Sequence, residues 1–119
     1  MLFICYEKCT TCQKAKKFLL DNNIDFITRP IKDENPTKDE LAKWIENSGL
    51  DIKKFFNTSG MLYREMQLKD KLKDMSMDEK LDLLASNGML VKRPLLITND
   101  NSVLVGFKQE QWEKVKWNH

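Results

Sequence analysis

Two cysteines, Cys9 and Cys12, stand between a short apolar run and a helical pattern near the start of the chain. Residues 2–6 predict a buried strand, and the apolar residues after Cys12 recur at helical spacing. Thr10 or Thr11 is expected to cap this helix. Cys9 is thereby predicted to lie at an exposed helix N-terminus, with Cys12 about one turn inside. Unpaired N–H groups and the helix dipole stabilise a thiolate at such a position.

The spacing of the two cysteines suits dithiol–disulfide chemistry. A helix start favours the thiolate, and Lys8 adds a positive neighbour. Cys9 is therefore predicted to be the attacking thiolate, and Cys12 the resolving thiol that closes an intramolecular disulfide. The alternatives are two inert cysteines or half of a zinc site. Zinc usually needs four ligands, and the other candidates are Cys5, expected in the core, and His119, so no metal site is expected.

The segments that follow predict a parallel strand pair and then a helical region. Residues 24–31 predict a second strand, with Pro30 limiting pairing near its end. A strand–helix–strand order is typical of a parallel pair joined by a right-handed crossover. Thr37 and Glu40 have the spacing of a capping box, which predicts a helix start. The pattern stays helical but interrupted up to residue 88, and we interpret residues 37–88 as a helical insertion.

The C-terminal part predicts a hairpin and a last helix. Residues 95–98 and 103–107 are β-rich and joined by four turn-forming residues. Residues 109–115 predict a helix with Trp112 facing inward. The whole order predicts one α/β domain over residues 1–119. It is thioredoxin-like, with a mixed four-stranded sheet flanked by helices and the insertion between the βαβ and ββα units.

Composition narrows the functional classes. With 119 residues, the chain is long enough for one domain with a core that needs no metal or structural disulfide. Its 20 basic and 18 acidic residues give a net charge of +2, so neither direct nucleic-acid binding nor membrane binding is expected. The sequence shows neither an apolar run of membrane-spanning length nor a signal peptide. We therefore expect a cytoplasmic protein, in which paired cysteines favour redox chemistry over a structural bridge.

Arg93 and Pro94 form a second informative pair, directly before the third predicted strand. In a thioredoxin fold, a cis-proline at this place packs against the redox helix and shapes the substrate groove. An ordinary proline that opens a strand is the alternative, because few X–Pro bonds are cis.

Three segments in order carry a resemblance to a known family: residues 8–15 around the cysteines, residues 55–60 with 63–65, and residues 90–94. Together they resemble the arsenate reductase family over nearly the whole chain. This family also holds the Spx-type transcription regulators and a branch of small reductases. The resemblance implies a thioredoxin-like domain with a helical insertion.

The resemblance also implies roles for single residues. The family's arsenate reductases bind the oxyanion with a catalytic cysteine and three arginines. Cys9 matches the cysteine and Arg93 one arginine, whereas Asn57 and Gly106 occupy the other two arginine positions. This loss removes most of the charge-assisted hydrogen bonding that an oxyanion needs. Those enzymes also lack the second cysteine and depend on glutathione and glutaredoxin, so Cys12 predicts a self-resolving protein instead.

We therefore predict a thiol–disulfide reductase acting on a protein or small-molecule disulfide. Arg93, Pro94 and Asn57 are predicted to bind the substrate, including an anionic group such as a glutathione carboxylate, and Arg64 is a candidate substitute cation. No bound cofactor is expected, and glutathione or thioredoxin is the expected electron donor. One alternative is an arsenate reductase linked to glutathione and glutaredoxin or to thioredoxin. The other is an Spx-type redox regulator that binds the RNA polymerase α subunit, although residues 57–60 look unlike the regulators' segment.

Overall fold

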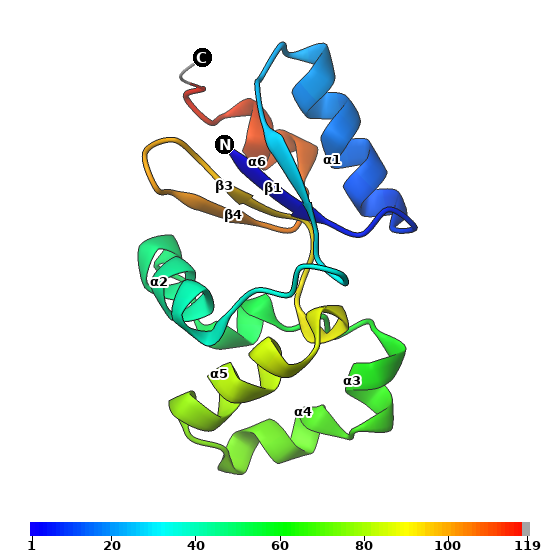
Figure 1. Ribbon diagram of the computed structural model, residues 1–119, viewed down its shortest axis with the longest axis vertical. Coiled ribbons are helices and arrows are strands. Elements are labelled where there is room, and N and C mark those ends of the chain that lie inside the picture. The colour runs from blue at the N-terminus through cyan, green and yellow to red at the C-terminus, as the bar shows by residue number, and fades with distance from the viewer. Residues whose placement is uncertain (118–119) are drawn as a thin grey trace.

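A mixed four-stranded sheet forms the centre of the computed structural model, which describes residues 1–117 (Figure 1). The strands are β1 (Leu2–Cys5), β2 (Ile27–Pro30), β3 (Leu95–Ile97) and β4 (Val103–Val105). Their order across the sheet is β2-β1-β3-β4. β1 pairs in parallel with β2 and antiparallel with β3, and β3 forms the hairpin with β4. The predicted α/β, thioredoxin-like fold class is confirmed.

Helices α1 (Thr10–Asp21) and α6 (Gln109–Glu113) cover one face of the sheet (Figure 1). Side chains alternate between the two faces along a strand, so Phe3 and Leu96 point toward these helices. Trp112 of α6 is fully buried among them, as the helical pattern predicted. The buried side chains of α1 pack against the sheet along the length of the helix, and this packing fixes the position of its N-terminus.

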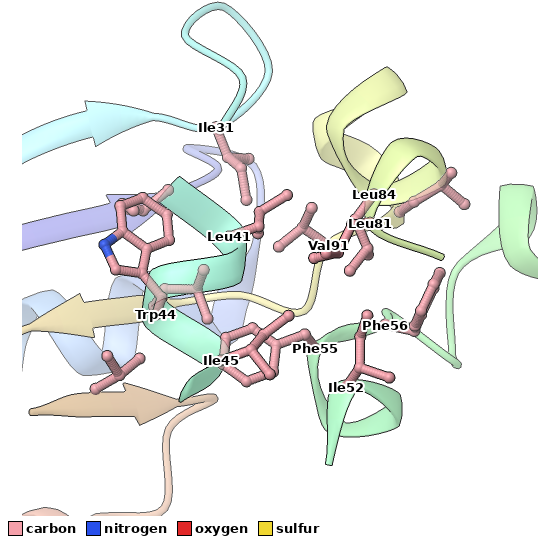
Figure 2. Close-up of a cluster of buried hydrophobic side chains, with 14 of the residues drawn as sticks. Ile31, Leu41, Trp44, Ile45, Ile52, Phe55, Phe56, Leu81, Leu84 and Val91 are labelled. Atoms are coloured by element: carbon pink, nitrogen blue, oxygen red, sulfur yellow. The ribbon is translucent and has the colours of Figure 1, made fainter. Parts of the chain in front are cut away.

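The opposite face is covered by α2 (Lys38–Ser48), which begins the insertion. Ile4 and Leu95 of the sheet pack in one cluster with Leu41 and Trp44 of this helix. Figure 2 shows the cluster running from the sheet, past α2, to the far helices of the insertion. A continuous apolar core therefore joins the insertion to the sheet.

The insertion is a chain of short helices, because turn-forming residues interrupt it repeatedly. After α2 come η1 (Ile52–Phe55), α3 (Met61–Glu65), α4 (Leu68–Lys71), η2 (Leu72–Asp74), α5 (Met77–Ser86) and η3 (Gly88–Leu90). The predicted capping box at the start of α2 is present. The Thr37 hydroxyl accepts from the Glu40 N–H, and the Glu40 carboxylate accepts from the Thr37 N–H. Gly49 ends α2 at a left-handed φ of 68°.

Backbone pairing returns the insertion to the sheet beside the cysteines. Phe56 and Val91 form an isolated antiparallel bridge. On either side of it, the Asn57 N–H donates to the Leu90 carbonyl at 2.8 Å, and the Lys92 N–H donates to the Phe55 carbonyl at 2.7 Å. This bridge brings the segment around Asn57 next to the segment that leads into β3.

The element boundaries differ from the sequence-based expectations at several places, among them the end of β4, which stops at Val105 rather than at residue 107. Cys9 itself is the N-cap of α1, so neither Thr10 nor Thr11 caps the helix as expected. β2 begins only at Ile27, because the residues before it follow the turn that ends α1 and do not pair with β1. The last helix ends at Glu113, two residues earlier than predicted. His119 lies outside the described residues.

Across residues 1–117, no helix has both the length and the apolar character that crossing a membrane would require.

Candidate active site

The two cysteines of the Cys-x-x-Cys differ in their access to solvent. Cys9 is partly exposed at the N-cap of α1, whereas Cys12 is only 2% exposed and packs in the core cluster beneath α1. The chain's three cysteines, all within the described residues, are free thiols in this structure. One sulfur is therefore open to a reactant and the other is shielded.

The surroundings of Cys9 favour its thiolate. Burial alone would raise its pKa, but hydrogen bonding from the backbone N–H and the thiol of Cys12, the positive charge of Arg93 and the Thr11 N–H together lower the pKa of Cys9 below its ordinary value. No side-chain hydrogen bond caps this helix at its N-cap residue Cys9. The N–H groups of the first turn, those of Thr11 and Cys12, act on the Cys9 sulfur instead. Lys8, which was predicted to be the positive neighbour of Cys9, is exposed. The positive charge that lowers the pKa of Cys9 comes from Arg93.

The surroundings of Cys12 have the opposite effect. Burial, together with its hydrogen bond to Cys9 and the negative charge of that thiolate, raises the pKa of Cys12 to about 12, although the Tyr6 N–H opposes this. That N–H donates to the Cys12 sulfur at 3.4 Å. In the reduced protein Cys12 is thus a protonated donor toward Cys9. The buried Cys5 thiol also has a raised pKa, mainly because of burial, and packs in the core as predicted.

A pocket of about 440 Å³ opens beside Cys9. Its walls come from the start of α1, the loop after η1, the segment before β3, the end of β4 and the start of α6. Three cations line it: Lys92, Arg93 and Lys108. No aspartate or glutamate is among the described residues of its lining, so the pocket is electropositive.

Arg93 is held above Tyr6 and points two unpaired groups into buried space. Its guanidinium carbon lies 5.1 Å from the centre of the Tyr6 ring. Its Nε and Nη1 atoms are buried without a hydrogen-bond partner among the described residues. The peptide bond between Arg93 and Pro94 is cis, and the Pro94 carbonyl accepts from the Gly106 N–H at 2.8 Å. Pro94, which was predicted to bind the substrate, is buried and is not among the residues that line the pocket.

The structure brings three of the six predicted site residues into one pocket. Cys9, Asn57 and Arg93 line the same pocket, and so does Gly106, the other position at which the family resemblance implies an arginine. Arg64 lies elsewhere: together with Met61 and Glu65 it lines a separate surface hollow. The geometry places this arginine outside the pocket that holds Cys9.

Sequence reasoning missed Lys92 and Lys108. Lys92 directly precedes Arg93, and Lys108 is the N-cap of α6. Lys92 lies in the segment 90–94 that carries the family resemblance but had no role assigned, Lys108 belongs to no motif, and only the fold brings them to Cys9. The adjacency of Lys92 and Arg93 was the one available signal. Among residues 1–117, no group of three or more metal-ligating side chains occurs.

The fold and the site define a class of protein: a thioredoxin-like α/β domain whose first helix starts at a Cys-x-x-Cys beside a cationic pocket. Comparison with known families agrees with this assignment. The model of the ArsC family matches residues 5–115, and the chain belongs to that family.

Several relatives cover almost the whole chain. An uncharacterized protein of Bacillus subtilis, YusI, is 54% identical over 114 residues, which are 96% of each chain. A crystal structure of an ArsC family related protein from Bacteroides fragilis has 57% identity and a TM-score of 0.91, covering 97% of this chain and 96% of that one. A possible arsenate reductase from Streptococcus mutans UA159 has 45% identity and a TM-score of 0.84, covering 94% and 96%.

Transcription regulators are more distant relatives. The regulatory protein MgsR of Bacillus subtilis is 29% identical over 104 residues, covering 87% of this chain and 81% of MgsR. The global transcriptional regulator Spx of Streptococcus pyogenes serotype M1 is 26% identical, covering 87% and 75%. The predicted relationship to arsenate reductase-like and Spx-type proteins is thereby confirmed.

Proposed function

We propose that this protein is a thiol–disulfide oxidoreductase in which Cys9 attacks and Cys12 resolves. The observation that carries the proposal is the asymmetry of the two thiols. The accessible Cys9 has a lowered pKa, whereas the pKa of the buried Cys12 is raised to about 12. The accessible Cys9 is therefore a thiolate more often than an ordinary cysteine at the same pH, whereas Cys12 stays protonated in the reduced protein.

The arrangement supports a two-step exchange. The Cys9 thiolate attacks one sulfur of a substrate disulfide, forms a mixed disulfide and releases the first thiolate. The charge on Cys9 is then gone, and with it two of the causes that raise the pKa of Cys12. Cys12 loses its proton more easily, helped by the Tyr6 N–H, and attacks the Cys9 sulfur. The second substrate thiolate leaves, and the Cys9–Cys12 disulfide remains to be reduced by glutathione or thioredoxin.

Trapping the mixed disulfide tests the proposal. In the Cys12→Ser variant the resolving sulfur is absent, so a substrate disulfide should stay bound to Cys9. Mass spectrometry of the digested protein locates the adduct, and Cys5→Ser is the matched control because Cys5 is also buried beneath α1. Adducts on Cys5, or none on Cys9, would overturn the assignment of roles.

Arsenate reduction is a second candidate, favoured by one observation. Arg93 has two buried guanidinium nitrogens without a partner, and it lines the pocket of Cys9. The charge of Arg93 would attract an oxyanion in this pocket. Asn57 and Gly106, however, bring no charge to the pocket, so we rank this function lower. An arsenate reductase would consume glutathione or thioredoxin reducing equivalents only when arsenate is present, whereas a disulfide reductase would consume them with a disulfide alone.

A regulatory role is the third candidate, supported by the similarity to MgsR and Spx. In this case the Cys9–Cys12 pair would act as a switch for binding the RNA polymerase α subunit, rather than as a catalyst. A regulator would retain purified α subunit in a pull-down, with retention that depends on the redox state of the pair. It would show no catalytic turnover of disulfides.

A further inference from the structure

Resting on the proposed function, we propose that the pocket selects disulfides carrying carboxylate groups near the S–S bond, and that Lys92 and Lys108 determine this selectivity. Both lysines line the pocket together with Cys9. A disulfide that approaches Cys9 must place the substituents of its sulfurs in this space. The charge of those substituents therefore affects how well the disulfide binds in the pocket.

The charge of the pocket is not neutralised from within. Lys92, Arg93 and Lys108 line it without an acidic neighbour in the described lining. None of the ion pairs formed among residues 1–117 involves any of these three cations. An anionic substituent would thus meet an uncompensated positive field, and a cationic one would be repelled.

The buried groups of Arg93 indicate the same ligand charge. Its Nε and Nη1 atoms donate to no group among the described residues. A buried charged donor without an acceptor is costly, and among residues 1–117 no acidic group of the pocket lining compensates this positive charge. The ring of Tyr6 already supports Arg93 from one side. A carboxylate in the pocket would be attracted by the charge of Arg93.

Lys92 takes the place of a side chain at position 106. Gly106 has a φ of +72°, and a Cβ atom there would lie 3.3 Å from Cε of Lys92. The aliphatic part of the Lys92 side chain thus lies over Gly106. Any side chain at position 106 would meet it, and the positive φ also favours glycine there. The positive charge in this part of the pocket therefore comes from Lys92, in the segment before β3, and not from an arginine at position 106. Lys108, at the start of α6, supplies a further cation.

The same cations assist the exchange itself. When Cys9 attacks, its sulfur forms one S–S bond and the substrate S–S bond breaks, with the electron pair leaving on the outer sulfur. Cys12 then gives up its proton to solvent, bonds to Cys9 and expels the second sulfur as a thiolate. The substrate is reduced by two electrons to two thiols, and the protein dithiol is oxidised to a disulfide. Both leaving thiolates are anions formed within the field of Lys92 and Lys108.

Three matched alkyl disulfides test the selectivity with the full chain. They are 3,3′-dithiodipropionate, which is anionic, bis(2-hydroxyethyl) disulfide, which is neutral, and cystamine, which is cationic. The rate at which each oxidises the reduced protein in one turnover is followed by quenching with an alkylating agent and mass spectrometry. Each rate is divided by the rate of the same disulfide with 2-mercaptoethanol, which removes differences in intrinsic reactivity.

We expect the normalised rates to fall from the anionic to the neutral to the cationic disulfide, and the differences to shrink as salt is added. Lys92→Gln and Lys108→Gln should each lower the rate with the anionic disulfide by about two- to fivefold. The rate with the neutral disulfide should fall less, because only its leaving thiolate interacts with these charges. Lys114→Gln, an exposed lysine outside the pocket lining, is the matched control and should change none of the rates.

The outcomes separate the selectivity from the reaction. Equal normalised rates for the three disulfides would overturn the selectivity and leave the proposed oxidoreductase intact. A preference of undiminished size in both Lys92→Gln and Lys108→Gln would overturn the role of the lysines. Failure of every disulfide to oxidise the Cys9–Cys12 pair would overturn the proposed function on which the selectivity rests.

Discussion

Tyr6 and Cys12 are joined by a hydrogen bond from the Tyr6 N–H to the Cys12 sulfur, 3.4 Å long. The ring of the same tyrosine lies beneath Arg93, 5.1 Å from its guanidinium carbon. Tyr6 therefore contacts two of the groups that lower the pKa of Cys9: the thiol of Cys12 and the guanidinium of Arg93. The residue that follows β1 thus organises the site, although it performs no chemistry of its own.

Arg93→Gln is expected to raise the pKa of Cys9, because the positive charge of Arg93 helps to lower it. The measurement is the rate of Cys9 alkylation by iodoacetamide as a function of pH, with the modified residue identified by mass spectrometry. Near neutral pH the variant should react more slowly than the natural protein. Arg64→Gln is the matched control, since Arg64 lies outside the Cys9 pocket. An equal change in both variants would contradict a specific role for Arg93.

Cys12→Ala is expected to raise the pKa of Cys9 as well, because hydrogen bonding from the Cys12 thiol to Cys9 is lost. Cys12→Ser keeps a hydroxyl donor and should raise that pKa less. The same alkylation profile distinguishes the two variants. If both variants shift the profile equally, the thiol of Cys12 does not act on Cys9 as a hydrogen-bond donor.

Glu40→Gln is expected to make stability less dependent on pH. The Glu40 carboxylate accepts two hydrogen bonds from Arg29, at 2.7 and 2.9 Å, and this lowers the pKa of Glu40 to about 2 in the folded protein. Since the folded pKa lies below the ordinary value, the stabilisation is present above about pH 4.5 and is lost as the pH falls toward about pH 2. With the side chain 34% exposed, we expect about 1–2 kcal/mol.

Urea unfolding near neutral pH and at about pH 3 measures this difference in the free energy of unfolding. The glutamine can still accept from the Thr37 N–H, so the capping box of α2 is retained while the charge is removed. Glu46→Gln, an exposed residue of the same helix, is the matched control. A loss of stability in Glu40→Gln that is the same at both pH values would show that the charge is not responsible.

Gly88→Ala is expected to destabilise the fold by about 2–3 kcal/mol, because overpacked sites force backbone shifts. A Cβ at Gly88 would lie 2.2 Å from the Ile31 carbonyl oxygen, where the insertion returns against the end of β2. Gly49→Ala is the comparison. At Gly49 a Cβ meets nothing within 4 Å, so only the positive φ of 68° is unfavourable, at about 1 kcal/mol. Thermal unfolding of both variants ranks them, and equal losses would contradict the contact.

The parts of the fold that the sequence predicted correctly are those set by local chemistry. The capping box of Thr37 and Glu40, the apolar run of β1 and the helical spacing after Cys12 each act within a few residues. The cap of α1 was predicted wrongly. A threonine is the usual cap, and nothing local showed that Cys9 would be the N-cap and Thr10 the first residue of the helix.

The site was only partly predictable because its walls are distant in sequence. Asn57 and Arg93 could be proposed from motifs, but the motif around Arg93 assigned no role to Lys92, and Lys108 belongs to none. They reach Cys9 through the bridge between Phe56 and Val91 and through the hairpin of β3 and β4. Such pairings depend on contacts between residues far apart in the chain, which no local pattern encodes.

The start of α1 at Cys9 has a consequence for the balance between the two redox states. The N–H groups of Cys12 and Thr11 and the charge of Arg93 stabilise a thiolate, and a disulfide carries no such charge. In a thermodynamic cycle, what stabilises the dithiol relative to the disulfide in the folded state raises the reduction potential of the pair. The folded protein should therefore be a stronger oxidant than the same two cysteines in the unfolded chain, and it should resist heat better when reduced than when oxidised.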